Sequence, residues 1–167
     1  RDKVLTDLMT SRPAGPSIVY VSLQKTAESV AELLSAAGLP ARPYHAGMED
    51  DIRAETQRWF LHSSDGIVVA TIAFGMGIDK PNIRYVYHYN PPSSLEAYAQ
   101  EIGRAGRDGQ DSICELLLVP EDRVVLENFT LGDTPPRQAV GRLLDIIAGQ
   151  ADTFHISHYQ LSAETDI

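Results

Sequence analysis

Residues 17–21 read Ser-Ile-Val-Tyr-Val and residues 67–70 read Ile-Val-Val-Ala, and these two short apolar runs decide the fold. Runs of β-branched and aromatic residues without polar alternation are typical of strands that are buried on both faces. Apolar residues at the spacing of one helix face follow the first run and predict a helix over 24–37; they are Ala27, Val30, Ala31 and Leu34. A buried strand that leads into an amphipathic helix is the repeating unit of a parallel α/β sheet.

The same alternation continues along the chain. It predicts further strands over 42–45, 82–89 and 113–119, a helix that begins at the acidic residues 49–51, and another that runs from a capping box of Ser93 and Glu96 to about Gly103. The fold class is therefore α/β, with a parallel sheet covered by helices on both faces. Ligands of such sheets bind beyond the carboxyl ends of the strands.

After Pro120 the pattern changes to helices alone, over 121–129 and 137–148. We therefore expect one lobe over residues 1–119, a C-terminal helical extension over 120–150, and a linker or the start of a further module over 151–167. A small winged-helix-like domain that engages duplex DNA is the module that we expect there.

Composition limits the classes of function. The chain has 167 residues, a formal charge of −9 and one cysteine, which excludes an internal disulfide and a zinc site built from several cysteines. No apolar run approaches the ~18 residues of a membrane span, and the chain begins with neither an initiator Met nor a signal-peptide pattern. We therefore expect a soluble, intracellular piece of a longer protein. Because the chain is acidic, any nucleic-acid binding must use amides, hydroxyls and a few well-placed cations.

Residues 100–109, Gln-Glu-Ile-Gly-Arg-Ala-Gly-Arg-Asp-Gly, are the most informative stretch. Gln100, Arg104 and Arg107 would share one stripe if the helix continued through them. The glycines between them are unfavourable in a plain helix, and small residues let an anion approach two arginines closely. Because the guanidinium group is a rigid fork of donors that suits phosphate oxygens, the stretch favours a phosphate site over a solvated helix end.

Three further stretches lie where predicted strands end. Residues 70–81 contain a Gly-x-Gly pair that fits a structural turn as well as close ligand approach, and Asp79 there could contact a ribose hydroxyl or cap a turn. In residues 44–48, a lone His45 is more often structural, and the acidic helix start beside it would repel a phosphate, so contacts should come from the loop. Ser22 fits a phosphate-contacting hydroxyl and a helix N-cap equally well.

Residues 71–81 followed by residues 100–109 closely resemble the second RecA-like lobe of RecQ-type DNA helicases, which are members of helicase superfamily 2. Ile18–Val21 resembles motif IV of that lobe, Tyr44–Met48 the segment that follows, Ala70–Pro81 motif V, and Gln100–Gly109 motif VI. The string Ala-Phe-Gly-Met-Gly-Ile-Asp-Lys-Pro, together with Gly-Arg-Ala-Gly-Arg-Asp-Gly, is more specific to RecQ than to DEAD-box RNA helicases. The resemblance extends over roughly residues 2–119 and implies a RecA-like sheet.

The resemblance also implies roles for the candidate residues. Arg107 is similar to the arginine finger that acts on ATP bound to the other lobe, and Arg104 and Gln100 are similar to its γ-phosphate and inter-lobe partners. Gly77 and Asp79 are similar to the group near the nucleotide ribose. The residues that resemble contacts to the phosphates of the tracked DNA strand are Ser22, His45, Gly47, Met48 and Thr71. Such contacts are independent of DNA sequence.

The chain departs from the family pattern in two places. It has neither a Gly-x-x-x-x-Gly-Lys-Ser/Thr loop nor an Asp-Glu-x-His box, so the lobe that binds ATP and magnesium is missing and this piece alone should not hydrolyse ATP. RecQ proteins typically continue into a zinc module with four cysteines, but residues 137–156 contain none, and Phe154 falls about where the first ligand would come. His155 and His158 cannot complete a tetrahedral site, so we expect no zinc, as in the zinc-less branch of RecQ-like proteins.

The resemblance therefore implies the second motor lobe of an ATP-dependent RecQ-like DNA helicase, with roles in DNA repair and recombination. Its partners would be single-stranded and duplex DNA and the first RecA-like lobe of the same chain, and no membrane. It would use ATP with magnesium, bound mainly by that first lobe. The alternatives are a superfamily 2 RNA helicase lobe and a non-catalytic nucleic-acid-binding remnant. The compartment would be cytoplasmic in a bacterium and nuclear in a eukaryote.

Overall fold

The structure is a computed structural model that describes residues 1–75, 78–124, 127 and 137–149. The chain divides into one compact unit over residues 1–122 and a second over residues 123–167. The second unit contains helix α6 (Arg137–Ala148), which has the bounds predicted from the sequence. The predictions for Gly77 and for the tail, including Phe154, His155 and His158, lie outside the described residues. Of the helix predicted over 121–129, residues 122–124 and 127 are helical, and residues 125, 126, 128 and 129 lie outside the described part.

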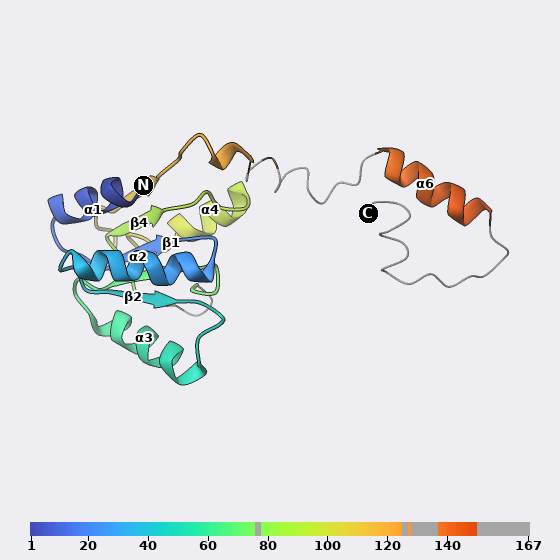
Figure 1. Cartoon of the computed structure of the whole chain (residues 1–167). Coiled ribbons are helices and arrows are strands. Elements are labelled where there is room, and N and C mark those ends of the chain that lie inside the picture. Colours follow the sequence, from blue (N-terminus) through green and yellow to red (C-terminus); the bar gives the residue numbers. More distant parts are fainter. Residues whose placement is uncertain (76–77, 125–126, 128–136, 150–167) are drawn as a thin grey trace. The chain divides into compact units, whose positions relative to one another are not determined.

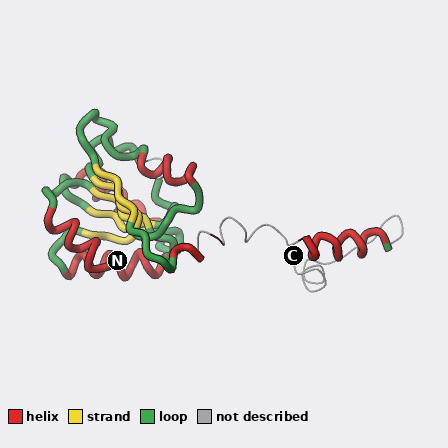
Figure 2. Tube along the Cα trace, turned by 90° about the horizontal axis from the view of Figure 1, so that it is seen from above, coloured by secondary structure: helices red, strands yellow, loops and turns green. Residues whose placement is uncertain are grey.

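The first unit is built on a five-stranded sheet (Figures 1 and 2). The strands lie in the order β2-β3-β1-β4-β5, and every neighbouring pair is parallel. The predicted α/β class is therefore confirmed, and the most apolar runs form the centre of the sheet. The strands are β1 (Ser17–Tyr20), β2 (Ala41–Tyr44), β3 (Ile67–Ala70), β4 (Tyr85–His88) and β5 (Ile113–Leu116).

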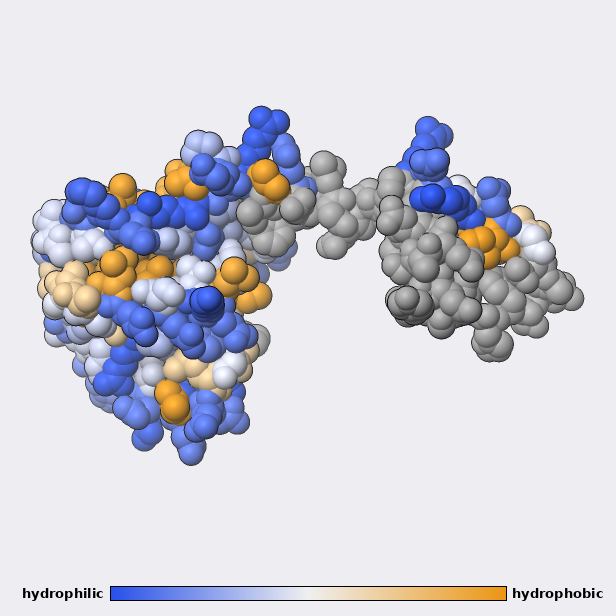
Figure 3. Space-filling view, viewed as in Figure 1, coloured by the Kyte–Doolittle hydropathy of each residue, from blue (hydrophilic) through white to orange (hydrophobic). Residues whose placement is uncertain are grey.

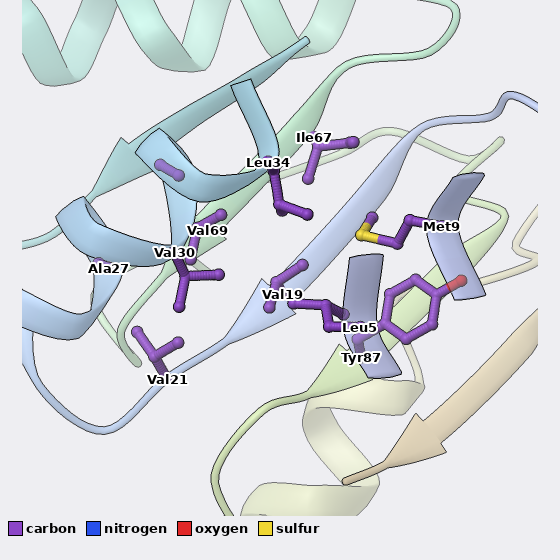
Figure 4. Close-up of a cluster of buried hydrophobic side chains, with 11 residues drawn as sticks. Leu5, Met9, Val19, Val21, Ala27, Val30, Leu34, Ile67, Val69 and Tyr87 are labelled. Atoms are coloured by element: carbon purple, nitrogen blue, oxygen red, sulfur yellow. The ribbon is translucent and has the colours of Figure 1, made fainter. Parts of the chain in front are cut away.

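Helices cover both faces of this sheet, as predicted. One face carries α1 (Asp2–Ser11) and α2 (Gln24–Ala36), and the other carries α3 (Asp50–His62) and α4 (Leu95–Ile102). Because side chains alternate along a strand, β1, β3 and β4 contribute buried side chains to both layers of the core. Figure 4 shows the first layer, in which α1 and α2 pack on β1, β3 and β4; its labelled side chains are Leu5, Met9, Val19, Val21, Ala27, Val30, Leu34, Ile67, Val69 and Tyr87.

One detail of the predicted α4 is wrong. Its N-cap is Ser94, whose Oγ accepts a hydrogen bond from the Ala97 amide at 3.1 Å, and the predicted Ser93 does not cap it. The helix ends at Ile102 with Gly103 as its C-cap, as predicted, and residues 103–108 form turns, so the helix does not continue to the arginines. The φ of +64° at Gly106 is incompatible with a continuing α-helix. Gln100 and the two arginines therefore do not share a helical stripe.

Polar contacts tie the two ends of the first unit together. Arg1 forms an ion pair with Asp122, and Arg1 Nε donates to the Leu117 carbonyl at 3.1 Å. Arg12, just after α1, donates to both carboxylate oxygens of Glu115 in β5 at 2.8 Å. Bidentate ion pairs such as that of Arg12 with Glu115 are the stronger kind. The contacts of Arg1 and Arg12 therefore fasten both ends of α1 to β5 and to the segment that follows it.

The surface of the first unit is mixed. On the face shown in Figure 3, hydrophobic side chains form small separate patches between hydrophilic ones. None of the helices in the described part of the chain is long and apolar enough to cross a membrane.

Candidate functional site

The candidate residues fall into two groups on different parts of the sheet. The strand-end group follows three neighbouring strands, β2, β3 and β1, whose last residues are paired in register. Its members therefore lie along one edge of the sheet, at the carboxyl ends where ligands of such sheets bind; they are Ser22, His45, Gly47, Met48 and Thr71. The arginine group comes from the two glycine-rich stretches, and its described members are Gly75, Asp79, Arg104 and Arg107.

Ser22 lies at the surface directly after β1. Its amide donates to Asn90 Oδ1 at 3.2 Å, which links the ends of β1 and β4. The N-cap of α2 is Leu23, without a side-chain capping bond, so the N-cap interpretation of Ser22 is wrong. The hydroxyl of Ser22 therefore does not cap the start of α2, and it lies at the edge of the sheet where a ligand is expected.

The loop after β2 is a tight turn around a buried imidazole. The His45 side chain is only 5% exposed, and its Nε2 lies 3.3 Å from Glu28 Oε1. The Met48 amide donates to the His45 carbonyl at 3.2 Å, and the His45 amide donates to Met48 Sδ at 3.4 Å. Gly47 is exposed, and a Cβ there would collide with the Gln24 side chain. The structural interpretation of His45 fits this burial, and a ligand would reach the loop through its main chain.

Thr71, after β3, is buried at the same edge. Its amide donates to the Tyr44 carbonyl at 3.2 Å, and its own carbonyl accepts from the Phe74 amide at 3.0 Å. Residues 71–74 therefore turn away from the sheet edge and lead the chain toward α4.

Arg104 lies directly on Gly75. Arg104 Nη1 donates to the Gly75 carbonyl at 2.6 Å, and a Cβ at Gly75 would lie 2.9 Å from Arg104 Cζ. That approach is closer than two carbons normally allow, so this placement of the guanidinium requires glycine at 75. The two stretches that the sequence indicates as functional are thus joined by a direct contact.

Arg107 is more exposed than Arg104. Its side chain is 43% exposed, and its Nη1 lies 4.0 Å from Oδ1 of Asp79, which is 92% exposed. An exposed pair at this distance contributes little to stability. Both side chains are therefore available to a ligand, and they lie close enough together to contact one ligand.

The turn that carries Arg107 is anchored to the segment before β4. The Gly106 amide donates to the Ile83 carbonyl at 3.0 Å, and Arg84 Nη2 donates to Asp108 Oδ1 at 2.6 Å. The ion pair with Arg84 holds the pKa of the Asp108 carboxyl below its usual value. The anchored turn lies near the amino end of β4, so the arginine group does not share the carboxyl-end edge with Ser22. If this group binds a ligand, its arginine contacts would lie apart from the carboxyl-end edge where ligands of such sheets are expected.

Two candidates add little to this geometry. Gln100 is exposed on α4, one helical turn before Arg104. Gly77 lies outside the described residues.

Sequence reasoning gave no role to Lys80. This lysine is buried, and its Nζ donates to the carbonyls of Leu61 at 3.0 Å and Ser63 at 2.8 Å, at the end of α3. Burial lowers the pKa of Lys80. Cations stabilise the last carbonyls of a helix, so Lys80 fixes residues 78–81 against α3 and thereby holds Asp79 in place.

A buried pair of ionisable side chains was also missed. His88, the last residue of β4, places Nε2 2.7 Å from Oε2 of Glu101 in α4. The only sequence signal was that Glu101 lies inside the arginine-rich stretch and follows the strand end of His88 by a short helix.

The two groups offer different chemistry. The arginine group combines two guanidinium groups with a carboxylate, which suits a nucleotide phosphate and a ribose hydroxyl. The strand-end group offers hydroxyls and main-chain amides without a cation of its own. Among the described residues, no three His, Cys, Asp or Glu side chains are grouped so that they could hold a metal ion.

Comparisons with known sequences find that the chain is similar to helicases. The family described as the helicase conserved C-terminal domain matches residues 1–109. The chain is 43% identical over 131 residues to the ATP-dependent DNA helicase RecQ of Bacillus subtilis, covering 78% of this chain and 22% of that protein. It is 47% identical over 117 residues to the RecQ-like DNA helicase blm-1 of Caenorhabditis elegans, covering 70% and 12%. The chain thus spans less than a quarter of the length of these relatives.

Solved structures share the fold. The E. coli DEAD-box protein SrmB, bound to regulator of ribonuclease activity A, matches with a TM-score of 0.68 and 26% identity, covering 77% of this chain and 75% of that one. The RNA helicase Prp28 from Chaetomium thermophilum, bound to ADP, matches with a TM-score of 0.65 and 31% identity, covering 75% and 31%. These likenesses confirm the RecA-like sheet that the sequence resemblance implied.

Proposed function

This chain belongs to the family of helicase conserved C-terminal domains, as a RecQ-type member, and we propose that it is the second motor lobe of an ATP-dependent DNA helicase. The observation that carries the proposal is the difference in exposure and contacts between two arginines. Arg104 is fixed on Gly75, whereas Arg107 is exposed on an anchored turn beside Asp79. A preorganised cation that can meet a phosphate from outside the lobe is what transition-state stabilisation requires.

The arginine group would act on ATP held by the first RecA-like lobe. When the two lobes close, Arg107 stabilises the charge that develops on the transferred γ-phosphoryl group. Arg104 and Gln100 contact the γ-phosphate and the facing lobe, and Asp79 with Gly77 lies near the ribose. Magnesium would be held mainly by the first lobe.

The strand-end group would hold the phosphates of one DNA strand. Ser22 and Thr71 offer hydroxyls, and residues 45–48 offer main-chain amides, so the grip does not depend on DNA sequence. This mode of contact also suits a chain with a charge of −9. Because the two groups lie on different parts of one lobe, a closure driven at the arginine group moves the DNA contacts with it.

One comparison favours a second candidate. The fold is shared with an RNA helicase at 31% identity, so the lobe could serve an RNA motor. The motif V and motif VI strings favour DNA, and the nucleic-acid preference of the protein decides between the two.

The test uses the whole protein, meaning a chain that carries this lobe together with an ATP-binding lobe. We expect ATP turnover stimulated by single-stranded DNA, and separation of a partial DNA duplex but not of an RNA duplex of the same sequence. Stimulation by RNA alone would favour the RNA helicase, and binding without ATP turnover would favour a non-catalytic remnant. The isolated lobe should show no DNA-stimulated turnover and no bound zinc by elemental analysis; turnover that survives repeated purification would contradict the proposal.

A further inference from the structure

Helix α4 is anchored to the sheet by a carboxylate. Among its residues, all of which the structure describes, Glu101 is buried, Ile102 packs against the apolar core while only partly buried, and Leu95 at its start is largely exposed. Burial of an ionisable group is costly unless it is paired, and an apolar residue would anchor a helix without that cost. An eight-residue helix is also too short to be stable by itself. A polar anchor on such a helix therefore calls for a reason other than stability.

The partner of this carboxylate is held in place by aromatic rings. His88 stacks on Tyr20 with ring centres 5.4 Å apart and packs against Tyr98 of α4 at 5.1 Å. Its Nδ1 is buried and has no hydrogen-bond partner within the described residues, whereas Nε2 lies 2.7 Å from Glu101 Oε2. This arrangement assigns the tautomer in which Nε2–H donates to the carboxylate. The pair therefore has one geometry, set by β1 and β4 on one side and α4 on the other.

The same cluster leads to the arginine group. The Arg104 amide donates to the Glu101 carbonyl at 3.3 Å, so the residue that anchors the helix also begins the turn that carries the arginines. The Tyr20 hydroxyl donates to the Phe74 carbonyl at 3.3 Å, next to the Gly75 carbonyl that binds Arg104. Burial raises the pKa of Tyr20 to about 12, although the nearby positive charge of Arg104 opposes that rise.

We propose that His88 and Glu101 are positioning residues for ATP hydrolysis, which hold the last turn of α4 so that Arg104 and Arg107 meet the nucleotide in one orientation. The proposal rests on the proposed function of the arginine group and names residues that act through it. A hydrogen-bonded pair fixes direction as well as distance, whereas an apolar contact has no preferred direction. This explains why the helix retains a buried carboxylate where an apolar side chain would be less costly.

The test separates positioning from stability. In the whole protein, His88→Phe with Glu101→Leu replaces the pair by side chains that keep the packing apolar, and such replacements are often neutral or stabilising. We expect an unchanged or higher unfolding temperature, an unchanged KM for ATP, and a kcat that falls by about ten- to a hundredfold, as a misplacement of about 1 Å can cause. The single variant Glu101→Gln keeps an acceptor for Nε2–H and should retain most of the kcat of the unmodified protein.

A matched control uses another ion pair of the same lobe. Arg12→Met with Glu115→Leu removes the pair between the end of α1 and β5, which touches no residue of the arginine group, and should leave kcat unchanged. If the His88 and Glu101 double variant does not fold, Glu101→Asp keeps the charge but shortens its reach, and should lower kcat in the same way.

An unchanged kcat in a folded double variant, or in Glu101→Asp, would overturn the inference. So would a kcat of Glu101→Gln that falls as far as the kcat of the double variant. Arg107→Ala is measured beside them. If it abolishes turnover while the pair variants retain it, only this inference is wrong. If it leaves turnover unchanged, the proposed function is wrong, and the inference with it.

Discussion

The two faces of the sheet are built differently. The layer under α1 and α2 has an apolar centre drawn from two helices and three strands, and buried polar side chains on that side, Ser17 and His45 among them, lie at strand ends. The layer under α3 and α4 also has an apolar centre, but polar side chains are buried around it: Thr56, Lys80, His88 and Glu101. Both layers derive from the same strands, whose side chains alternate between the two faces.

We expect this difference to separate residues that matter mainly for stability from residues that matter mainly for function. An apolar layer tolerates changes of shape as long as volume is kept, and its energy is not directional. Buried polar groups cost free energy unless each meets its partner, so they fix the position of whatever they hold. On the α3 and α4 face they hold residues 78–81 and the turn after α4, which are the segments that carry Asp79 and Arg107.

Replacement of Arg107 by alanine is the largest expected effect on the polar face. In the whole protein, we expect kcat for ATP to fall by about 10³-fold or more, because an arginine finger acts mainly in the transition state. Nucleotide affinity and the unfolding temperature should change little, since the side chain is half exposed. Steady-state kinetics with a separate nucleotide-binding measurement gives the result. A rise in KM with an unchanged kcat would make Arg107 a ground-state ligand instead.

Replacement of Leu34 by alanine tests the apolar face. Leu34 is fully buried under α2, and its truncation should lower the free energy of unfolding by about 2–5 kcal/mol. Below the unfolding temperature, kcat of the whole protein should remain that of the unmodified protein. Chemical denaturation and ATP turnover on the same preparation check both halves. A large loss of kcat without a loss of stability would contradict the division between the two faces.

Gly106→Ala sharpens the comparison, because a matched glycine exists on the other face. Gly106 has a φ of +64°, and a Cβ there would lie 2.9 Å from the Gln110 carbonyl oxygen. Gly38, at the end of α2, has a φ of +83° and open space around it. Both substitutions should cost about 1 kcal/mol or more through backbone strain. Only Gly106→Ala should also lower kcat, by roughly tenfold, because it displaces the turn that carries Arg107; equal kcat values would show that this turn need not be rigid.

Ser22→Ala is the smallest expected effect. Loss of one hydroxyl donor to a solvent-exposed, anionic DNA phosphate should weaken single-strand binding by a few fold, or about 1 kcal/mol. Ser29→Ala is the control, since the Ser29 hydroxyl donates to the Lys25 carbonyl within α2, away from the strand ends. Binding of a labelled oligonucleotide at several salt concentrations measures both. Equal affinities for the two variants would remove Ser22 from the DNA contacts.

The sequence predicts the fold more fully than the site. Apolar periodicity identifies the strands, the helix faces and both ends of α6, because these follow from burial and local spacing. It also singles out Arg104, Arg107 and Asp79 through the glycines around them, which favour a phosphate site at the arginines and leave a structural turn open at Asp79. It does not predict the turns of residues 103–108 that follow α4, since these are anchored to Ile83 and Arg84 from elsewhere in the chain.

The remaining gaps have the same physical origin. The contact of Arg104 with Gly75, the capping of α3 by Lys80 and the pairing of His88 with Glu101 all join residues that are distant in sequence or lie on different elements. Local pattern carries no information about such pairs. For His45, the residues alone favour a structural role, and the burial of its ring against Glu28 fits that interpretation.

The clamp between Arg1 and Asp122 has a consequence for how force passes through the lobe. Because Arg1 and Asp122 are paired, a force that separated these two residues would act first on that ion pair and on the Arg1 bond to Leu117. A unit with neighbouring ends can be inserted into a longer chain and turned as one body without shearing its sheet.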